Sequence, residues 1–296
     1  MVLLIFKQRL NGGFLKNWKP CLAGALVVLV WSGWITISRY GVHSLLTPAD
    51  ITLLRYGTAF IIMFPLILKY PWKKSSLHQY LIVGLGVGFP YTMVSFYGLM
   101  EIRAAHAGVL VNGMLPVFGA IAAWLYFKQR VSLVRYGAIL LIFMANLVMI
   151  GGNLFSFDQL LGVFLLLSAA VIYTFYMLGV RLWKFTWRDV LVIIPAVNFV
   201  LFLPFWFFFP STGFQVPISE ILLQATYQGN VVNLVALPCV AYAIRHLGTI
   251  TVSLFMAFVP VITALFAWLM LGENLSGLEI TGIVGCTAGL AVYSRG

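Results

Sequence analysis

Hydrophobic runs of membrane-crossing length dominate the chain, and only short polar segments separate them. A helix needs about 20 mostly apolar residues to cross a bilayer. The runs that reach or approach this length have expected boundaries at 20–41, 48–69, 77–99, 104–127, 133–151, 159–181, 187–209, 220–244, 249–271 and 277–294. The pattern therefore predicts an all-α integral membrane protein with ten transmembrane helices.

Residues that favour helix N-termini stand at the start of several runs. Residues 47–50 (Thr-Pro-Ala-Asp) combine a capping hydroxyl, a proline at the first helical position and an acid in the first turn. Residues 186–189 (Thr-Trp-Arg-Asp) are similar, and residues 76–79 and 276–279 have the spacing of a capping box. Each site falls where a hydrophobic run begins, so together they support the expected boundaries.

One segment occurs twice, 144 residues apart. Residues 114–132 read MLPVFGAIAAWLYFKQRVS and residues 258–276 read FVPVITALFAWLMLGENLS. The offset covers five runs, an odd number, so the two copies must cross the membrane in opposite directions. A weaker similarity, at an offset of 138 residues, joins the first and sixth runs. The sequence thus predicts two inverted repeats, residues 20–151 and 159–294, which is typical of secondary transporters.

Both copies carry a proline in the same register, Pro116 and Pro260, near the expected middle of the bilayer. A proline removes one backbone N–H and kinks a helix, and the freed carbonyl needs a partner from protein or water. Two interpretations are open: a pair of hinged helices that line a central pathway, or packing kinks without a mobile role. The shared register favours the hinges.

The composition decides how the charge is interpreted. The chain is 62% hydrophobic and 8% charged, whereas a soluble domain is about 25% charged. The net charge of +11 then indicates orientation rather than nucleic-acid binding. With the N-terminus in the cytoplasm, 15 of the 18 Lys and Arg residues lie on that side, and only Arg39, Arg55 and Arg103 lie on the other. We expect both termini in the cytoplasm and the first run to be retained rather than cleaved as a signal peptide.

Several short motifs stand at fixed places in the two halves. They are Trp31-Ser32-Gly33-Trp34 followed by Arg39, Leu54-Arg55-Tyr56, Ala107-Gly108 through Pro116-Val117, and Leu271-Gly272-Glu273-Asn274-Leu275-Ser276. With ten spans in two inverted halves, nearly the whole chain resembles the EamA-type transporters of the drug/metabolite transporter superfamily. The resemblance implies transport of small organic solutes, often export of amino acids or related metabolites. It also implies a multi-pass protein of the plasma membrane, which in bacteria is the inner membrane.

Two features depart from that family or from its relatives. Gln129 stands where the family has a Glu after the fourth helix. No acidic residue lies between Trp18 and Val42, whereas small multidrug members of the superfamily carry a membrane-embedded Glu in their first helix. The second departure disfavours proton-coupled export of cationic drugs.

The resemblance places the cavity wall on the first, third, fourth, sixth, eighth and ninth helices. Aromatic rings with a few amides or hydroxyls suit a pathway for amphipathic solutes. The candidate substrate-binding residues there are Trp31, Trp34, Tyr91, Asn112, Tyr173, Tyr176, Asn233, Ser253 and Met256. Each could instead serve in helix–helix packing, and Asn146 and Asn198 are expected to lie outside the cavity.

Two arginines complete the candidate site, because a charge within a span is by default a functional hypothesis. Arg39 and Arg55 could bind a substrate carboxylate, which a guanidinium matches in shape. Alternatively, Arg39 reaches to the interface and Arg55 pairs with a carbonyl or an acid in the bundle. The family pattern has a basic residue at both places whatever the substrate, which favours the second interpretation.

We therefore predict a secondary transporter, an exporter or facilitator, of small amphipathic metabolites such as amino acids. Alternatives are export of nucleotide-like metabolites or drugs, and a non-transporting assembly or sensor subunit. An enzyme is disfavoured because no catalytic polar cluster is visible at depth.

The three cysteines lie in apolar runs and fit neither disulfides nor a metal site, so we expect no cofactor. The lack of acids at mid-depth favours facilitation or exchange over strict proton coupling. We expect a monomer or weak homodimer in the lipid bilayer, with a small-molecule substrate and no nucleic acid.

Overall fold

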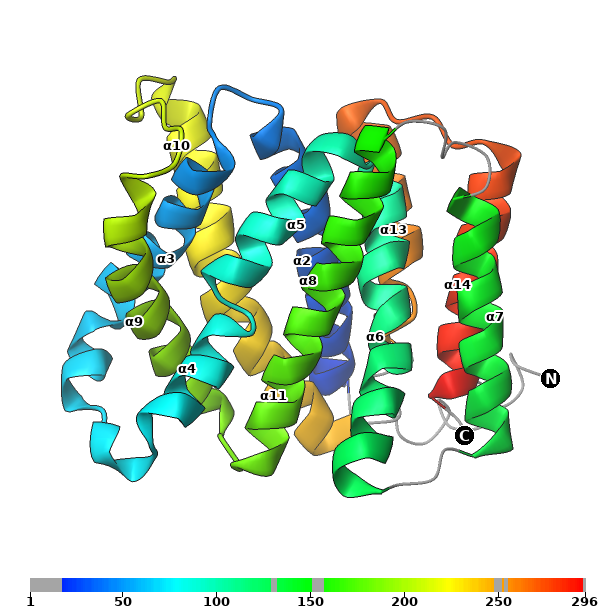
Figure 1. The fold of residues 1–296 in the computed structure, drawn as a ribbon, viewed down its shortest axis with the longest axis horizontal. Helices are drawn as coiled ribbons and strands as arrows, with labels where there is room; N and C mark the ends of the chain where they lie inside the picture. The colour runs from blue at the N-terminus through cyan, green and yellow to red at the C-terminus, as the bar shows by residue number, and fades with distance from the viewer. Residues whose placement is uncertain (1–17, 129–131, 151–156, 248–251, 253–254, 295–296) are drawn as a thin grey trace.

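The computed structural model describes residues 18–128, 132–150, 157–247, 252 and 255–294, and this part of the chain consists of helices and connecting loops without a strand (Figure 1). The elements are α2 (Trp18–Val42), α3 (Pro48–Lys69), η1 (Trp72–Lys74), α4 (Leu77–Leu85), α5 (Phe89–Glu101), α6 (Ala104–Phe127), α7 (Leu133–Ile150), α8 (Phe157–Leu182), α9 (Trp187–Trp206), α10 (Ile218–Gln224), η2 (Ala225–Ala236), α11 (Leu237–Leu247), α13 (Val259–Leu271) and α14 (Gly277–Tyr293). The predicted all-helical class is confirmed.

Six helical stretches of the described residues are long and apolar enough to cross a membrane. They are Trp18–Val42, Pro48–Lys69, Leu77–Glu101, Ala104–Tyr126, Gln159–Leu182 and Trp187–Trp206, and shorter apolar helices cover Leu133–Val148, Val259–Leu271 and Gly277–Tyr293. Large apolar side chains such as Ile61, Phe164 and Leu133 are exposed on the outside of the bundle. A surface of this kind is stable against lipid acyl chains and unstable against water.

The third hydrophobic run differs from the prediction, because it breaks at residues 86–88 between α4 and α5. Pro90 stands in the first turn of α5, where its missing N–H costs no helical hydrogen bond. The buried Asn198 on α9 supplies the bonds that the break leaves open. Its Oδ1 accepts from the Phe89 N–H at 2.7 Å, and its Nδ2 donates to the Gly84 carbonyl at 2.9 Å. Asn198 on α9 therefore contacts both α4 and α5, and it lies outside the cavity.

The eighth and ninth runs are also irregular. α10 continues into the π-helix η2 and then into α11, and α13 begins only at Val259, after a turn. Pro116 consequently lies inside the continuous helix α6, whereas Pro260 lies in the first turn of α13. The two prolines share a register in the sequence but not a helical context. Both remain candidates for hinges.

The capping residues predicted from the sequence form as expected. Thr47 with Asp50 at the start of α3, and Thr186 with Asp189 at the start of α9, each form a reciprocal capping box. The box at residues 276–279 opens α14 in the same way. Each box satisfies backbone N–H groups that a helix N-terminus otherwise leaves without partners.

The two capping aspartates also join the halves of the chain to each other. Asp50 accepts a hydrogen bond from the Trp206 indole at 3.0 Å, where α9 ends. Asp189 accepts from the Tyr70 phenol at 2.8 Å and from Lys74 at 3.0 Å, beyond the end of α3. Burial and the neighbouring carboxylate raise the pKa of Tyr70, so its phenol remains a donor at neutral pH. α3 and α9 thus lie antiparallel and are tied together at both ends.

Candidate functional site

A cavity of about 80 Å³ lies between the two halves of the bundle. Its walls come from α2, α3, the break between α4 and α5, α5 itself, α6, α8, α9 and η2. Eight of the eleven predicted substrate-binding residues line it: Trp31, Trp34, Arg55, Tyr91, Asn112, Tyr173, Tyr176 and Asn233. The structure therefore brings most of the candidate site together around one space, although their binding of a substrate remains a prediction.

Of the other three candidates, Met256 is not among the residues that line the cavity. It packs against the small buried cluster that includes Ala23 and Ala243 and also against the central core cluster that includes Trp34 and Tyr91. Arg39 is engaged at one end of the bundle, as described below. Ser253 lies outside the described residues.

Four aromatic rings form a continuous row along the cavity. Trp34 stacks on Tyr91 with ring centroids 5.7 Å apart and an interplanar angle of 17°. Tyr91 contacts Tyr173 at 5.5 Å, and Tyr173 contacts Tyr176 at 5.3 Å. Rings in such contacts hold each other in place, and they offer both apolar faces and polar edges to a bound molecule.

Arg55 brings a positive charge to this aromatic row. Its side chain is buried, its guanidinium carbon lies 5.6 Å from the ring centroids of both Trp34 and Tyr56, and its Nη1 donates to the Gln228 amide oxygen at 2.9 Å. None of the ion pairs formed by the described residues includes Arg55. A buried cation costs free energy unless a counter-charge is near, and cation–π contacts offset only part of that cost.

Two hydrogen-bond donors at the cavity are unused. Within the described part of the chain, Arg55 Nε and Trp34 Nε1 are buried and have no acceptor. Buried donors almost always have partners, so such exceptions need an explanation. An acceptor with negative charge, placed in the cavity, would serve both groups.

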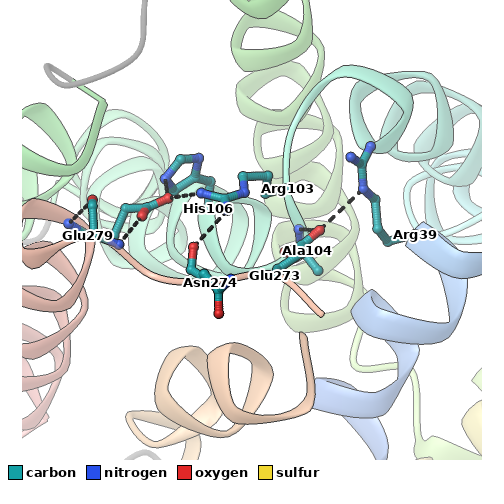
Figure 2. Close-up of polar contacts among 8 residues, drawn as sticks. Arg39, Arg103, Ala104, His106, Glu273, Asn274 and Glu279 are labelled. Atoms are coloured by element: carbon teal, nitrogen blue, oxygen red, sulfur yellow. Dashed lines mark hydrogen bonds and ion pairs between the residues drawn. The ribbon is translucent and has the colours of Figure 1, made fainter. Parts of the chain in front are cut away.

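A second polar cluster closes one end of the bundle (Figure 2). Glu273, in the loop between α13 and α14, lies 3.4 Å from Arg39 Nε on α2 and accepts from the Ala104 N–H at 3.3 Å. Arg39 also donates to the carbonyls of Leu99 and Met100 at the end of α5. These contacts join α2, α5, α6 and the α13–α14 loop. They engage Nε and Nη1 of the Arg39 head group.

Glu279, at the start of α14, extends this cluster (Figure 2). Its Oε1 lies 2.7 Å from Arg103 Nη1 and 2.8 Å from His106 Nε2, and its Oε2 accepts from the Ser276 N–H. Arg103 donates further to the Asn274 carbonyl at 2.6 Å. We call the set formed by Arg39, Arg103, His106, Glu273 and Glu279 the terminal ion network. It connects helices of both halves at a single end of the bundle.

Neither Gln228 nor the terminal ion network was predicted from the sequence. Gln224 and Gln228 lie four residues apart in a hydrophobic run, which could have marked one polar helix face. The network pairs residues that are far apart in the sequence, and no local pattern reports such pairs. Among the described residues, no three histidine, cysteine or carboxylate side chains come together to hold a metal.

A helical bundle with a central aromatic and cationic cavity between two similar halves is the architecture of a membrane transport protein. Residues 18–151 and residues 160–295 each match the model of the EamA-like transporter family. The chain belongs to this family, which confirms the resemblance seen in its motifs.

Relatives support the same class. An uncharacterized transporter of Archaeoglobus fulgidus is 24% identical over 275 residues, covering 87% of this chain and 91% of the relative. The uncharacterized transporter YoaV of Bacillus subtilis is 23% identical over 263 residues, covering 84% and 88%. A solved crystal structure shares the fold with a TM-score of 0.63 and 19% identity, covering 92% of this chain and 95% of that one. The protein is a multi-pass membrane transporter.

Proposed function

We propose that the protein is a secondary transporter of small amphipathic metabolites that carry a carboxylate, with amino acids as the first candidates. Arg55 is the observation that carries this proposal: a buried cation at the cavity, without an acidic partner among the described residues and with its Nε unused. A substrate carboxylate would supply the missing charge, and the row from Trp34 to Tyr176 would accept an apolar or aromatic body.

The proposed mechanism is alternating access of two inverted repeats of five spans each. The cavity of about 80 Å³ is smaller than the roughly 300–1,000 Å³ of a usual ligand pocket. We therefore take this conformation as closed around the centre, and binding requires it to widen. Pro116 and Pro260 are the proposed hinges, because a proline removes a hydrogen bond that a bending helix would otherwise break.

The distribution of Lys and Arg supports an orientation with both termini in the cytoplasm of a plasma membrane, which in bacteria is the inner membrane. The terminal ion network then lies at the outer end, where α2 ends and α6 begins. Opening to the outside requires that these ion pairs separate. We propose facilitation or exchange rather than proton coupling, because none of the described residues that line the cavity has a carboxylate that could carry a proton.

Counterflow in proteoliposomes tests this function. Vesicles are loaded with unlabelled amino acids and other metabolites, and entry of labelled solute is followed with and without a pH gradient. We expect exchange of carboxylate-bearing solutes that is insensitive to pH and is lost in Arg55→Ala. Exchange that needs a proton gradient would contradict the coupling proposal, and exchange restricted to solutes without a carboxylate would contradict the role of Arg55.

A further inference from the structure

Gln228 is the side chain that contacts the cavity arginine, and it is itself completely buried on η2. Its Oε1 accepts from Arg55 at 2.9 Å, while its Nε2 donates to the Ser38 hydroxyl at 3.0 Å and to Gln224 Oε1 at 3.2 Å. Gln224 in turn donates to the Ile37 carbonyl at 3.1 Å. A guanidinium has only donors, so the amide oxygen must face Arg55. The chain of bonds therefore fixes one orientation of the Gln228 amide.

Specific contacts also hold the backbone around Gln228 in place. Asn233 Nδ2 donates to the Gln228 carbonyl at 3.2 Å, across a turn of the π-helix. The next residue, Gly229, lies so close to α3 that a Cβ there would overlap the Thr58 hydroxyl. π-helical turns often mark functional sites, because they place a side chain where a regular helix would not. Here the turn brings a glutamine against the arginine.

The neutrality of Gln228 is the important property. A carboxylate in its place would pair with Arg55 permanently and neutralise it, whereas an amide orients the guanidinium and leaves its charge available. We infer that Gln228 is a positioning residue that reserves the Arg55 charge for an anionic solute and so sets the charge preference of the cavity. This inference rests on the proposed function, and it adds the residue that controls selectivity.

The test exchanges the amide for a carboxylate of the same shape, Gln228→Glu. The probes are 3-phenylpropionate and its neutral amide, 3-phenylpropanamide, titrated calorimetrically into the purified full chain in lipid nanodiscs. We expect the variant to bind the carboxylate about 10- to 100-fold more weakly and the amide within about threefold of the original protein. Gln79→Glu, which adds the same charge in the first turn of α4, is the matched control and should bind both probes like the original protein.

A second variant keeps the test valid if a buried glutamate disturbs folding, which thermal unfolding of each variant would show. Gln228→Met removes the acceptor without adding charge, and we expect it to lower carboxylate affinity about three- to tenfold while amide affinity stays within about threefold. A role in packing alone would change the affinity of both probes equally.

The outcomes distinguish a failure of the inference about Gln228 from a failure of the proposed function. If the original protein prefers the carboxylate and both Gln228 variants keep that preference, the inference about Gln228 is overturned and the proposed function stands. If the original protein binds both probes equally well, or binds only the amide, the carboxylate anchor itself fails and the inference fails with it.

Discussion

The second helices of the two halves, α3 and α9, are alike where they begin and different where they reach the cavity. Their capping boxes set a shift of 139 residues, from Asp50 to Asp189. The same shift relates Arg55 to Ile194, and both of these residues line the cavity. One half therefore offers a charge and the other an apolar side chain at equivalent places. A symmetric scaffold can thus carry an asymmetric site, because the caps hold the backbone while a single side chain decides the chemistry.

The largest expected effect comes from removing that charge. Arg55→Gln should lower kcat/KM for a carboxylate-bearing solute roughly 1,000-fold, or by about 4 kcal/mol, because the solute anion would lose the buried counter-charge that Arg55 supplies at the cavity wall. Initial rates of counterflow measure the change. Ile194→Val, at the equivalent place, should change the rate less than about threefold, since it only trims an apolar contact. Equal losses in the two variants would show that the asymmetry has no bearing on transport.

The capping aspartates provide the next comparison, on stability. Asp50 is completely buried and accepts from Trp206, Ser211 and Thr212, so Asp50→Ala should lower the free energy of unfolding by about 3 kcal/mol. For Asp189→Ala we expect about 2 kcal/mol, since a half-exposed Lys74 is among the partners of Asp189. Unfolding in mixed detergent micelles measures both values.

Salt distinguishes the two aspartates further. Screening weakens an exposed ion pair but hardly affects buried hydrogen bonds to neutral donors. The penalty of Asp189→Ala should therefore shrink at 0.5 M NaCl while that of Asp50→Ala stays constant. A penalty for Asp50→Ala that falls with salt would contradict its assignment as a buried acceptor of neutral donors.

The two ends of the bundle differ in charge as well. Glu273 and Glu279 belong to the terminal ion network, whereas Gln129 and Arg135 stand 144 residues earlier at the corresponding places of the first half. Gln129 lies outside the described residues. Because these places are acidic only in the second half, as Glu273 and Glu279, we expect the terminal ion network to favour closure of the end of the bundle where it lies.

Glu279→Gln tests that bias. Removing a buried carboxylate between Arg103 and His106 should raise the population of the open state about tenfold, a shift of about 1.4 kcal/mol. Spin labels at the exposed Leu45 and Leu278, in a variant without native cysteines, would report a broader distance distribution by pulsed electron resonance. Lys74→Gln removes an ion pair elsewhere and should leave this distribution unchanged. The same distribution in the original protein and in Glu279→Gln would rule out a role of the network in closure.

Regular and irregular segments differ in how well the sequence predicted them. Helices such as α3 and α6 begin and end where hydropathy indicates, and a capping box also marks the start of α3, because these signals are local. The break at residues 86–88 depends on Asn198, more than 100 residues away in the chain, and hydropathy alone predicts one continuous helix there. The polar residues Gln228, Asn230 and Asn233 of η2 could have indicated a polar helix face, but they do not indicate a π-helical turn.

The candidate site, too, could be predicted from the sequence only in part. Its aromatic residues could be predicted because the family resemblance places the cavity on particular helices, and Arg55 because charged side chains within apolar spans are rare. The particular partner of Arg55 could not, because the expected carbonyl or acid is the side-chain amide oxygen of Gln228, which lies 173 residues away in the chain. Arg39 was predicted from the same kind of signal as Arg55, yet its partners are Glu273 and two carbonyls outside the cavity. Only the packing of distant helices distinguishes the two arginines.

The smallest expected effect concerns the turn near the end of each repeated segment. Gly272 has a left-handed backbone with φ of 66°, and Lys128, 144 residues earlier, has φ of 53°. Left-handed backbone costs a residue with a Cβ about 1 kcal/mol and costs glycine little. Gly272→Ala should therefore lower the melting temperature by about 2–4 °C, and Lys128→Gly should raise it by a smaller amount.

The turn at Gly272 also directs Glu273 toward Arg39 and the Ala104 N–H. Backbone strain introduced at residue 272 should therefore also weaken the contacts of Glu273 in the terminal ion network. A double-mutant cycle separates the two contributions, because backbone strain alone is independent of the carboxylate. If the turn positions Glu273, Gly272→Ala will cost less in a Glu273→Gln background than in the original protein. Equal costs in both backgrounds would confine the effect to the backbone, and the glycine would then serve only to end α13.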